Sequence, residues 1–333
     1  MRSSLEFLRF IFICIIAIWH DTTLNVIFFH SVVVEFFFIL SGFLLYKTFK
    51  NNTPPPPLIY AKSRIKRLYC EYFVALIITI IINIIREPTY IREVIGDLIP
   101  ELFMIQSIGI FNGGINPINW YIQVMLVSSF FLYSLLYCNS QLAKNVLIPM
   151  LALGGLTYLF TIGDSVVRWE TVGCIYLPLL RGLCCMSVGV LSAWIFMESN
   201  NTSHWKHLFI NIFSIVAIVL IFVAIRIQEP LDKYVIFLSP FIIMACFEDK
   251  SWLNAVFHAK WQLYLGRISY AMLLIHCAYI PVFHKMISMV NTGLSVKIPF
   301  TLTIVLYLLI LVLLSVMFQK LCDFIRQYAL NYK

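Results

Sequence analysis

Long apolar runs separated by short polar segments dominate the sequence. A helix needs about 20 predominantly apolar residues to cross the hydrocarbon core of a bilayer. We predict ten such spans, at residues 7–26, 31–49, 68–86, 119–138, 145–163, 173–197, 208–226, 233–248, 262–283 and 298–320. Runs of this length exclude an outer-membrane barrel, whose strands alternate over about ten residues. The pattern therefore predicts an all-α polytopic membrane protein in which residues 1–333 form one integral-membrane domain.

The composition and the placement of basic residues agree with this prediction. Hydrophobic residues make up 61% of the chain and charged residues 12%, whereas soluble domains are about 45–50% apolar and about 25% charged. With the N-terminus in the cytoplasm, the inner segments carry about twice as many Lys and Arg residues as the outer ones, in line with the positive-inside rule. We therefore predict that both termini are cytoplasmic. The net charge of +8 then reflects topology, and a nucleic-acid partner is not expected.

The nine cysteines lie mostly within the predicted spans or at their edges. None shows the spacing of a metal site, and a buried free cysteine behaves as a small hydrophobic residue. We predict that the cysteines serve packing and that the chain has no metal site.

Arg9 and His20 lie eleven residues apart in the first predicted span. Eleven residues turn an ideal helix through about three turns, which brings both side chains to one face, about 16 Å apart along the axis. An arginine at membrane depth usually faces a polar cavity or a partner, and a histidine can accept a proton near neutral pH. The pair indicates a polar interior in which His20 acts as a base or carries an acyl group. The alternative places Arg9 and His20 at the two membrane surfaces.

Four basic residues, Lys62, Arg64, Lys66 and Arg67, follow the prolines at 54–57. Arg64 and Arg67 are three residues apart and share a helix face, so they can form a fork for a phosphate or pyrophosphate. The alternative is that these residues only mark a cytoplasmic helix end, because the positive-inside rule produces such clusters.

Glu35 and Ser41 belong to the second predicted span. A carboxylate at this depth needs a partner or is neutral, and either His20 or an arginine could pair with Glu35. Ser41 and the adjacent Gly42 are small enough to let two spans approach closely.

Three further residues stand out in later spans. Arg181 lies well inside the sixth span, where an arginine is a functional hypothesis by default. His276 lies within the ninth span and fits a hydrogen-bonded structural role as well as a catalytic one. Trp120 begins the fourth span, where it fits an anchor in the aromatic belt of the membrane interface.

Six segments, taken in order, resemble the motifs of the membrane acyltransferase-3 family, which O-acylates cell-envelope carbohydrates. They are the Arg9-x10-His20 segment, Glu35 to Phe43 with its Ser-Gly-Phe, Tyr60 to Tyr72 with Arg64 and Arg67, the segment Asn119-Trp120-Tyr121-Ile122-Gln123, Pro178 to Gly189 with Arg181, and Leu265 to His276. The resemblance covers almost the whole chain. We expect the stand-alone form of the family, without a periplasmic hydrolase-like domain.

The resemblance implies an O-acyltransferase, first of all an O-acetyltransferase, in the cell inner (plasma) membrane. Its donor is cytoplasmic acyl-CoA, and its acceptor is a hydroxyl of an envelope carbohydrate or lipid-linked glycan. No bound cofactor is expected. The implied catalytic residues are His20, Arg9 and Glu35, the implied donor-binding residues are Arg64 and Arg67, and the other intramembrane polar residues are Ser41, Trp120, Arg181 and His276.

Two departures from the family pattern limit what is carried over. Gln123 stands where many members carry a glutamate, so no acid role is assigned there. Cys70 and Glu71 replace a proline that is common after the basic motif, which changes how the third span begins.

Three alternatives stay open. Succinyl transfer is the nearest, because nothing in the sequence sizes the donor pocket. A proton-coupled transporter of an anion or lipid-linked sugar would also place Arg, Glu and His inside the membrane, although no internal repeat is visible. A non-catalytic subunit of a polysaccharide machine is the third.

Overall fold

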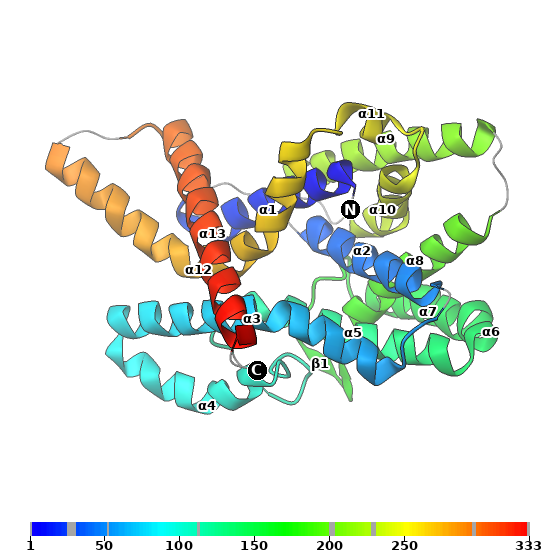
Figure 1. Cartoon of the computed structure of the whole chain (residues 1–333), viewed down its shortest axis with the longest axis horizontal. Coiled ribbons are helices and arrows are strands. Elements are labelled where there is room, and N and C mark those ends of the chain that lie inside the picture. The colour runs from blue at the N-terminus through cyan, green and yellow to red at the C-terminus, as the bar shows by residue number, and fades with distance from the viewer. Residues whose placement is uncertain are drawn as a thin grey trace.

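Helices make up nearly all of the computed structural model, which describes residues 2–24, 31–51, 53–111, 114–199, 204–227, 231–294 and 298–331 (Figure 1). The helices are α1 Ser3–His20, α2 Ser31–Phe49, α3 Pro57–Arg86, α4 Ile91–Leu102, α5 Asn119–Cys138, α6 Ser140–Leu142, α7 Ile148–Thr161, α8 Leu177–Glu198, α9 His204–Ile227, α10 Asp232–Phe247, α11 Trp252–Val256, α12 Lys260–Leu294 and α13 Phe300–Asn331. Short 3₁₀ turns cover Thr22–Leu24 and Pro88–Tyr90, and a π-helical segment covers Ala143–Leu147. The strands β1 Thr171–Val172 and β2 Ile175–Tyr176 form an antiparallel hairpin.

Nine helices of the described chain are long and apolar enough to cross a membrane, with α6, the π-helical segment and α7 taken together as one continuous helix over Ser140–Thr161. The prediction of an all-α polytopic membrane protein is thus confirmed, but ten full-length spans are not found. The exception is the predicted span 233–248, where α10 has only 16 residues, or about 24 Å of a core about 30 Å thick. Asp232 at its first turn is buried and accepts hydrogen bonds from Ser165 and from the backbone N–H of Val166, so α10 begins inside the protein. Residues 25 and 26 of the first predicted span lie outside the described residues.

Two glycines bring α2 and α8 into close contact. A Cβ added at Gly42 would lie 2.0 Å from the carbonyl oxygen of Met186, and one added at Gly189 would lie 2.0 Å from that of Ile39. Real Cβ atoms do not approach backbone this closely, so neither position admits a larger residue without separating the helices. This contact agrees with the expectation that Ser41 and Gly42 let two spans approach.

A third glycine performs the same role between α1 and α12. A Cβ at Gly266 would lie 2.3 Å from the Cβ of Glu6. The two helices stay together along their length, because the His20 ring near the end of α1 packs against His276 of α12. The pairs α1–α12 and α2–α8 therefore carry most of the polar residues singled out in the sequence.

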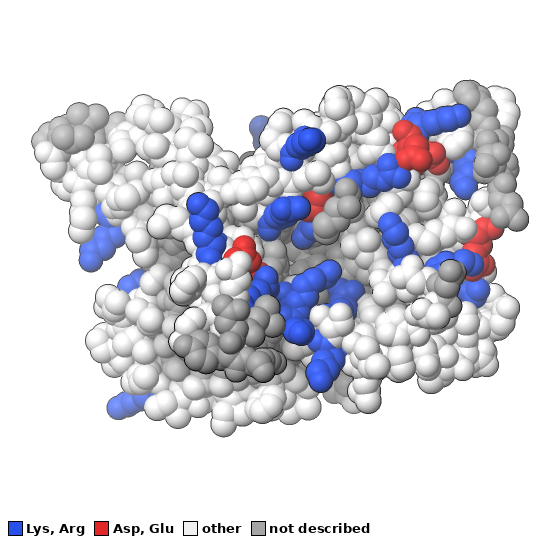
Figure 2. Space-filling model, in the orientation of Figure 1, with Lys and Arg blue, Asp and Glu red and all other residues white. Residues whose placement is uncertain are grey.

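One face of the molecule is rich in Lys and Arg side chains, which gather around a depression near its middle (Figure 2). Lys62, Lys66 and Arg67, near the beginning of α3, are exposed. Arg86, at the other end of the same helix, is also exposed. By the predicted topology, the beginning of α3 faces the cytoplasm, and the end of α1 at His20 faces the outside.

Candidate functional site

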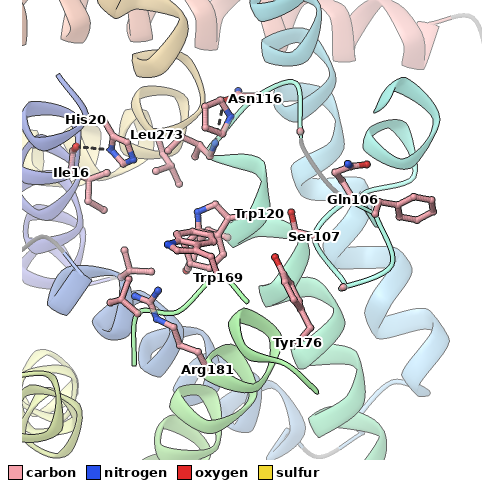
Figure 3. Close-up of a pocket in the computed structure, with 18 of the residues that line it drawn as sticks. Ile16, His20, Gln106, Ser107, Asn116, Trp120, Trp169, Tyr176, Arg181 and Leu273 are labelled. Atoms are coloured by element: carbon pink, nitrogen blue, oxygen red, sulfur yellow. Dashed lines mark hydrogen bonds between the residues drawn. The ribbon is translucent and has the colours of Figure 1, made fainter. Parts of the chain in front are cut away.

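A cavity of about 990 Å³ lies where α1, α5, α8 and α12 meet the segment after α4 and the β-hairpin. Its lining includes Ile16, Trp19, His20, Phe37, Glu101, Gln106, Ser107, Asn116, Trp120, Tyr121, Trp169, Glu170, Tyr176, Arg181 and Leu273 (Figure 3). The volume is at the upper end of the range of about 300–1,000 Å³ typical of ligand pockets. Its mixture of aromatic and hydrogen-bonding groups is suited to a polar organic molecule.

His20 brings an imidazole to the cavity wall. Its Nδ1 lies 2.9 Å from the carbonyl oxygen of Ile16 (Figure 3). A carbonyl only accepts hydrogen bonds, so Nδ1 must carry the proton and donate it. The lone pair is consequently on Nε2, which is the tautomer that can accept a proton from a substrate hydroxyl.

His276 packs against His20, with the two ring centroids 5.0 Å apart. His276 is completely buried, and its Nδ1 donates to the carbonyl oxygens of Leu273 at 2.8 Å and Met272 at 3.2 Å. Its structural hydrogen bond was one of the two roles considered from the sequence. Its contact with His20 was not foreseen, because the two residues come from opposite ends of the chain.

The same two histidines lie beside Cys277. One nitrogen of His20, one nitrogen of His276 and the sulfur of Cys277 all lie within 4.8 Å of one another, and Sγ of Cys277 is 3.4 Å from Nε2 of His276. Two imidazoles and a thiolate are a ligand set that zinc accepts. The 4.8 Å bound is wider than the spacing between ligand atoms on one zinc ion, so the grouping alone does not define a zinc site. The absence of a metal site therefore stays a prediction.

Glu35 pairs with Arg181 rather than with His20. The Nε of Arg181 donates to Oε1 of Glu35 at 2.7 Å, and Nη2 contacts the same oxygen. Both side chains are buried, at 0% and 2% exposure, so each compensates the charge of the other. Arg181 lines the cavity and Glu35 lies behind it, so Glu35 can orient Arg181 but not the imidazole.

Trp120 belongs to the cavity wall. Its ring lies 5.5 Å from the guanidinium carbon of Arg181 and 4.7 Å from the ring of Trp169, edge to face. A cation over an aromatic face is attracted by the negative charge of that face. Trp120 therefore joins the buried ion pair to the cavity, and its role as an interfacial anchor stays a prediction.

Arg9, Arg64 and Arg67 share one electrostatic environment on the cytoplasmic side of the predicted topology. The charges of Arg9 and Arg64 both act on Arg67. Arg9 is offset by Glu6, whose Oε2 accepts from Nη1 at 2.9 Å, whereas the buried Nε of Arg64 has no hydrogen-bond partner among the described residues. Three cations near one carboxylate leave a net positive site that attracts an anion.

Tyr121 lies between the arginine cluster and the cavity. It lines the cavity, its hydroxyl is hydrogen-bonded to Ser41, and the charges of Arg9 and Arg64 act on it. Ser41 and Tyr121 therefore mark the boundary between the basic site and the cavity that contains His20. Arg9 and His20 bracket this boundary on α1, about 16 Å apart along the helix.

Glu101 is the main cavity residue that sequence reasoning missed. It is buried, and its Oε2 accepts hydrogen bonds from Tyr72 at 2.5 Å, Asn119 at 2.9 Å and Gln123 at 3.1 Å. Burial raises the pKa of Glu101, and the hydrogen bonds from Tyr72 and Asn119 oppose the shift in part. A single glutamate within the apolar outer stretch 98–110 was the only signal for it.

Gln123 completes this network. Its Oε1 accepts from the backbone N–H of Ser107 at 2.6 Å, while its Nε2 donates to Tyr72 and Glu101. A glutamate at this position would place a second carboxylate beside Glu101, which costs free energy at low dielectric. Glu101 of α4 already supplies the carboxylate at this place, which explains why position 123 carries a glutamine instead of the glutamate of many family members.

The fold and the cavity define an integral membrane protein with a polar chamber and a histidine on its wall. The chain belongs to the acyltransferase-3 family, because the profile of that family, described as an acyltransferase domain, matches residues 2–320. No curated protein and no solved structure matched the chain in the comparisons made. The protein is thus a membrane acyltransferase, and the identity of donor and acceptor has to be argued from the site.

Proposed function

We propose that the chain is an O-acetyltransferase of the inner (plasma) membrane that moves acetyl from acetyl-CoA to a hydroxyl of an envelope carbohydrate or its lipid-linked precursor. The observation that carries the proposal is the imidazole of His20, whose Nδ1–H donates to the carbonyl of Ile16 and which lines a cavity large enough for an acceptor. A base with this tautomer suits deprotonation of an alcohol during attack on a thioester.

In the proposed reaction, the acceptor oxygen attacks the thioester carbonyl while Nε2 of His20 takes the hydroxyl proton. The carbon–sulfur bond then breaks, and the same proton passes from His20 to the departing CoA sulfur. Bond order and charge balance without a further reactant. Arg181, held by Glu35, presents a positive group to the cavity in which the oxyanion develops, and such preorganised charge is the usual source of transition-state stabilisation.

The donor site is proposed at Arg9, Arg64 and Arg67. CoA carries its phosphates at one end and its thioester at the other, so a long donor can be held by the arginines while its acyl group reaches His20. Arginine forks suit phosphate oxygens. The role of Arg9 that this placement supports is donor binding, because its charge acts on Arg67 and Tyr121.

The charged groups that line the cavity favour an acetyl donor over a succinyl donor. A succinyl group would bring a carboxylate close to His20. The described lining already contains two carboxyl groups, Glu101 and Glu170. An uncharged acyl group avoids the repulsion and the desolvation cost that a third carboxylate would meet.

The proposal is tested by incubating membranes that contain the chain with radiolabelled acetyl-CoA or succinyl-CoA in parallel. Label should enter the glycans of the membranes, lipid-linked glycans included, from acetyl-CoA, and only in membranes with the chain. A transporter or a non-catalytic subunit would give no chain-dependent label from either donor, and label from succinyl-CoA alone would contradict the assignment of the acyl group.

A further inference from the structure

The connection between α7 and α8 forms one wall of the cavity, and the motifs used above do not include it. We propose that Trp169 of this connection is the platform on which a sugar ring of the acceptor stacks, and that this residue selects the acceptor. The inference rests on the proposed function, since it names the part of the cavity that the acceptor occupies.

Trp169 presents an open aromatic surface on a fixed support. Its ring lies edge to face with Trp120 at 4.7 Å and 79°, so that one edge is fixed by packing. The residue is still 55% exposed and lines the cavity (Figure 3). An aromatic residue that is anchored and also uncovered loses little conformational entropy when a ligand stacks on it.

The backbone around Trp169 is held at several points. Thr171 pairs with Tyr176 in the hairpin, and the N–H of Leu177 donates to the carbonyl of Glu170 at 3.2 Å. Earlier in the connection, the side chain of Ser165 donates to buried Asp232 at the start of α10. The connection is therefore a supported wall whose side chains keep their positions.

Tyr176 continues the same wall. Gly109, with φ of +94°, passes so close that an added Cβ would lie 2.6 Å from the Cβ of Tyr176. Burial of Tyr176 raises the pKa of its phenol, so it remains a neutral hydroxyl group. Trp169 and Tyr176 together offer an aromatic face beside a hydrogen-bonding group.

The chemistry of this wall fits a neutral pyranose ring. The C–H bonds on one face of a sugar carry partial positive charge and are attracted to the negative face of an indole. The sugar hydroxyls need hydrogen-bonding groups at the edges, and Gln106, Ser107 and Asn116 line the same cavity. Sugar hydroxyls can donate to and accept from these groups, whereas an acyl chain offers them no hydrogen-bonding partner.

The test measures the kinetics of purified protein in nanodiscs, with acetyl-CoA and the delipidated glycan fraction of the host envelope as probes. Trp169→Ala should raise the KM for the glycan about tenfold, the loss expected for one stacked aromatic ring. The KM for acetyl-CoA should not change. Trp169→Phe keeps a ring and should remain within about threefold of the wild type, and Trp205→Ala, which removes an exposed tryptophan of α9, should match the wild type.

A wild-type glycan KM in Trp169→Ala would overturn the inference. An equal rise of both KM values, or a loss of kcat that Trp169→Phe does not restore, would also overturn it, because it would indicate a structural role. If the wild-type protein itself transferred no acetyl group, the proposed function would fail, and this result is distinct from the three results above.

Discussion

The imidazole rings of His20 and His276 lie 5.0 Å apart, although they come from the first and the twelfth helix. Each Nδ1 donates to a carbonyl one turn earlier in its own helix. The helix backbone thereby selects the same tautomer in both rings, with the lone pair on Nε2. His276 is fully buried and packs on His20, so we expect it to position the ring of His20 rather than to contact the substrate.

Replacement of His276 tests this positioning role. His276→Ala leaves space beside His20 and lets its ring move, and displacement of a reacting group by about 1 Å costs about 100-fold in rate. We expect kcat to fall by about 10- to 100-fold while the KM for acetyl-CoA is unchanged. A planar side chain, as in His276→Phe, should restore part of the rate, and steady-state kinetics of both variants decide the matter. A His276→Ala enzyme with wild-type kcat would contradict it.

The arginine cluster should bind the phosphates of the donor. Loss of charge-assisted hydrogen bonds costs about 1.5–3 kcal/mol, so Arg64→Ala combined with Arg67→Ala should raise the KM for acetyl-CoA at least about tenfold. Acetyl-pantetheine, which lacks the nucleotide phosphates, should react equally well with the wild type and this variant.

The matched control for this experiment is Arg86→Ala, which removes an exposed arginine at the other end of α3. Arg86→Ala should leave the KM for acetyl-CoA and the KM for acetyl-pantetheine unchanged. If the double variant lost activity with acetyl-pantetheine as strongly as with acetyl-CoA, the cluster would not be a phosphate site.

Close contact between α2 and α8 should be intolerant of a methyl group. Gly42→Ala would place a Cβ 2.0 Å from the carbonyl oxygen of Met186, and overpacking of this kind costs about 1–3 kcal/mol or more. Separation of α2 from α8 would also disturb the pair between Glu35 and Arg181. We expect a lower apparent Tm in detergent. Gly154→Ala in α7, where no atom lies within 4 Å of the added Cβ, should unfold at the temperature of the wild type or higher; equal Tm values for the two variants would argue against the close contact.

Glu101 should make the stability of the folded protein depend on pH. Burial raises the pKa of Glu101, so the native state holds this proton more tightly than the unfolded state, whose glutamate has a pKa of about 4.3. The contribution of Glu101 to stability is therefore greatest below pH 4.3 and decreases as pH rises through the native pKa. The Tm of the wild type minus that of Glu101→Gln should decrease between pH 4 and 8. Glu93→Gln, at an exposed position of the same helix, should show no such trend, and a difference that increases with pH would refute the assignment.

The sequence predicted the helical class and most span positions because those follow from long apolar runs. The predicted span 119–138 agrees with α5 at both ends. The predicted span 233–248 matches α10 to within one residue, but hydropathy does not reveal that Asp232, at the start of this helix, is bonded inside the protein to Ser165.

The site was less predictable. The eleven-residue spacing of Arg9 and His20 placed both on one helix. It could not show that His276 packs on His20 or that Glu35 forms its ion pair with Arg181. Such partners depend on contacts between distant helices. Trp169 lies in the connection between α7 and α8, and Glu101 lies near the end of α4; the sequence does not show that both elements fold against the cavity.

The most direct test of the proposed mechanism compares acetyl transfer by purified wild-type protein and by His20→Ala, with acetyl-CoA and a glycan acceptor. Removal of a general base typically costs 100- to 10,000-fold. His20→Ala should therefore lose transfer by about this factor, while it still elutes as a folded protein and is stabilised by acetyl-CoA in a thermal-shift assay. Transfer at the wild-type rate by this folded, donor-binding variant would contradict the role of His20 as the base.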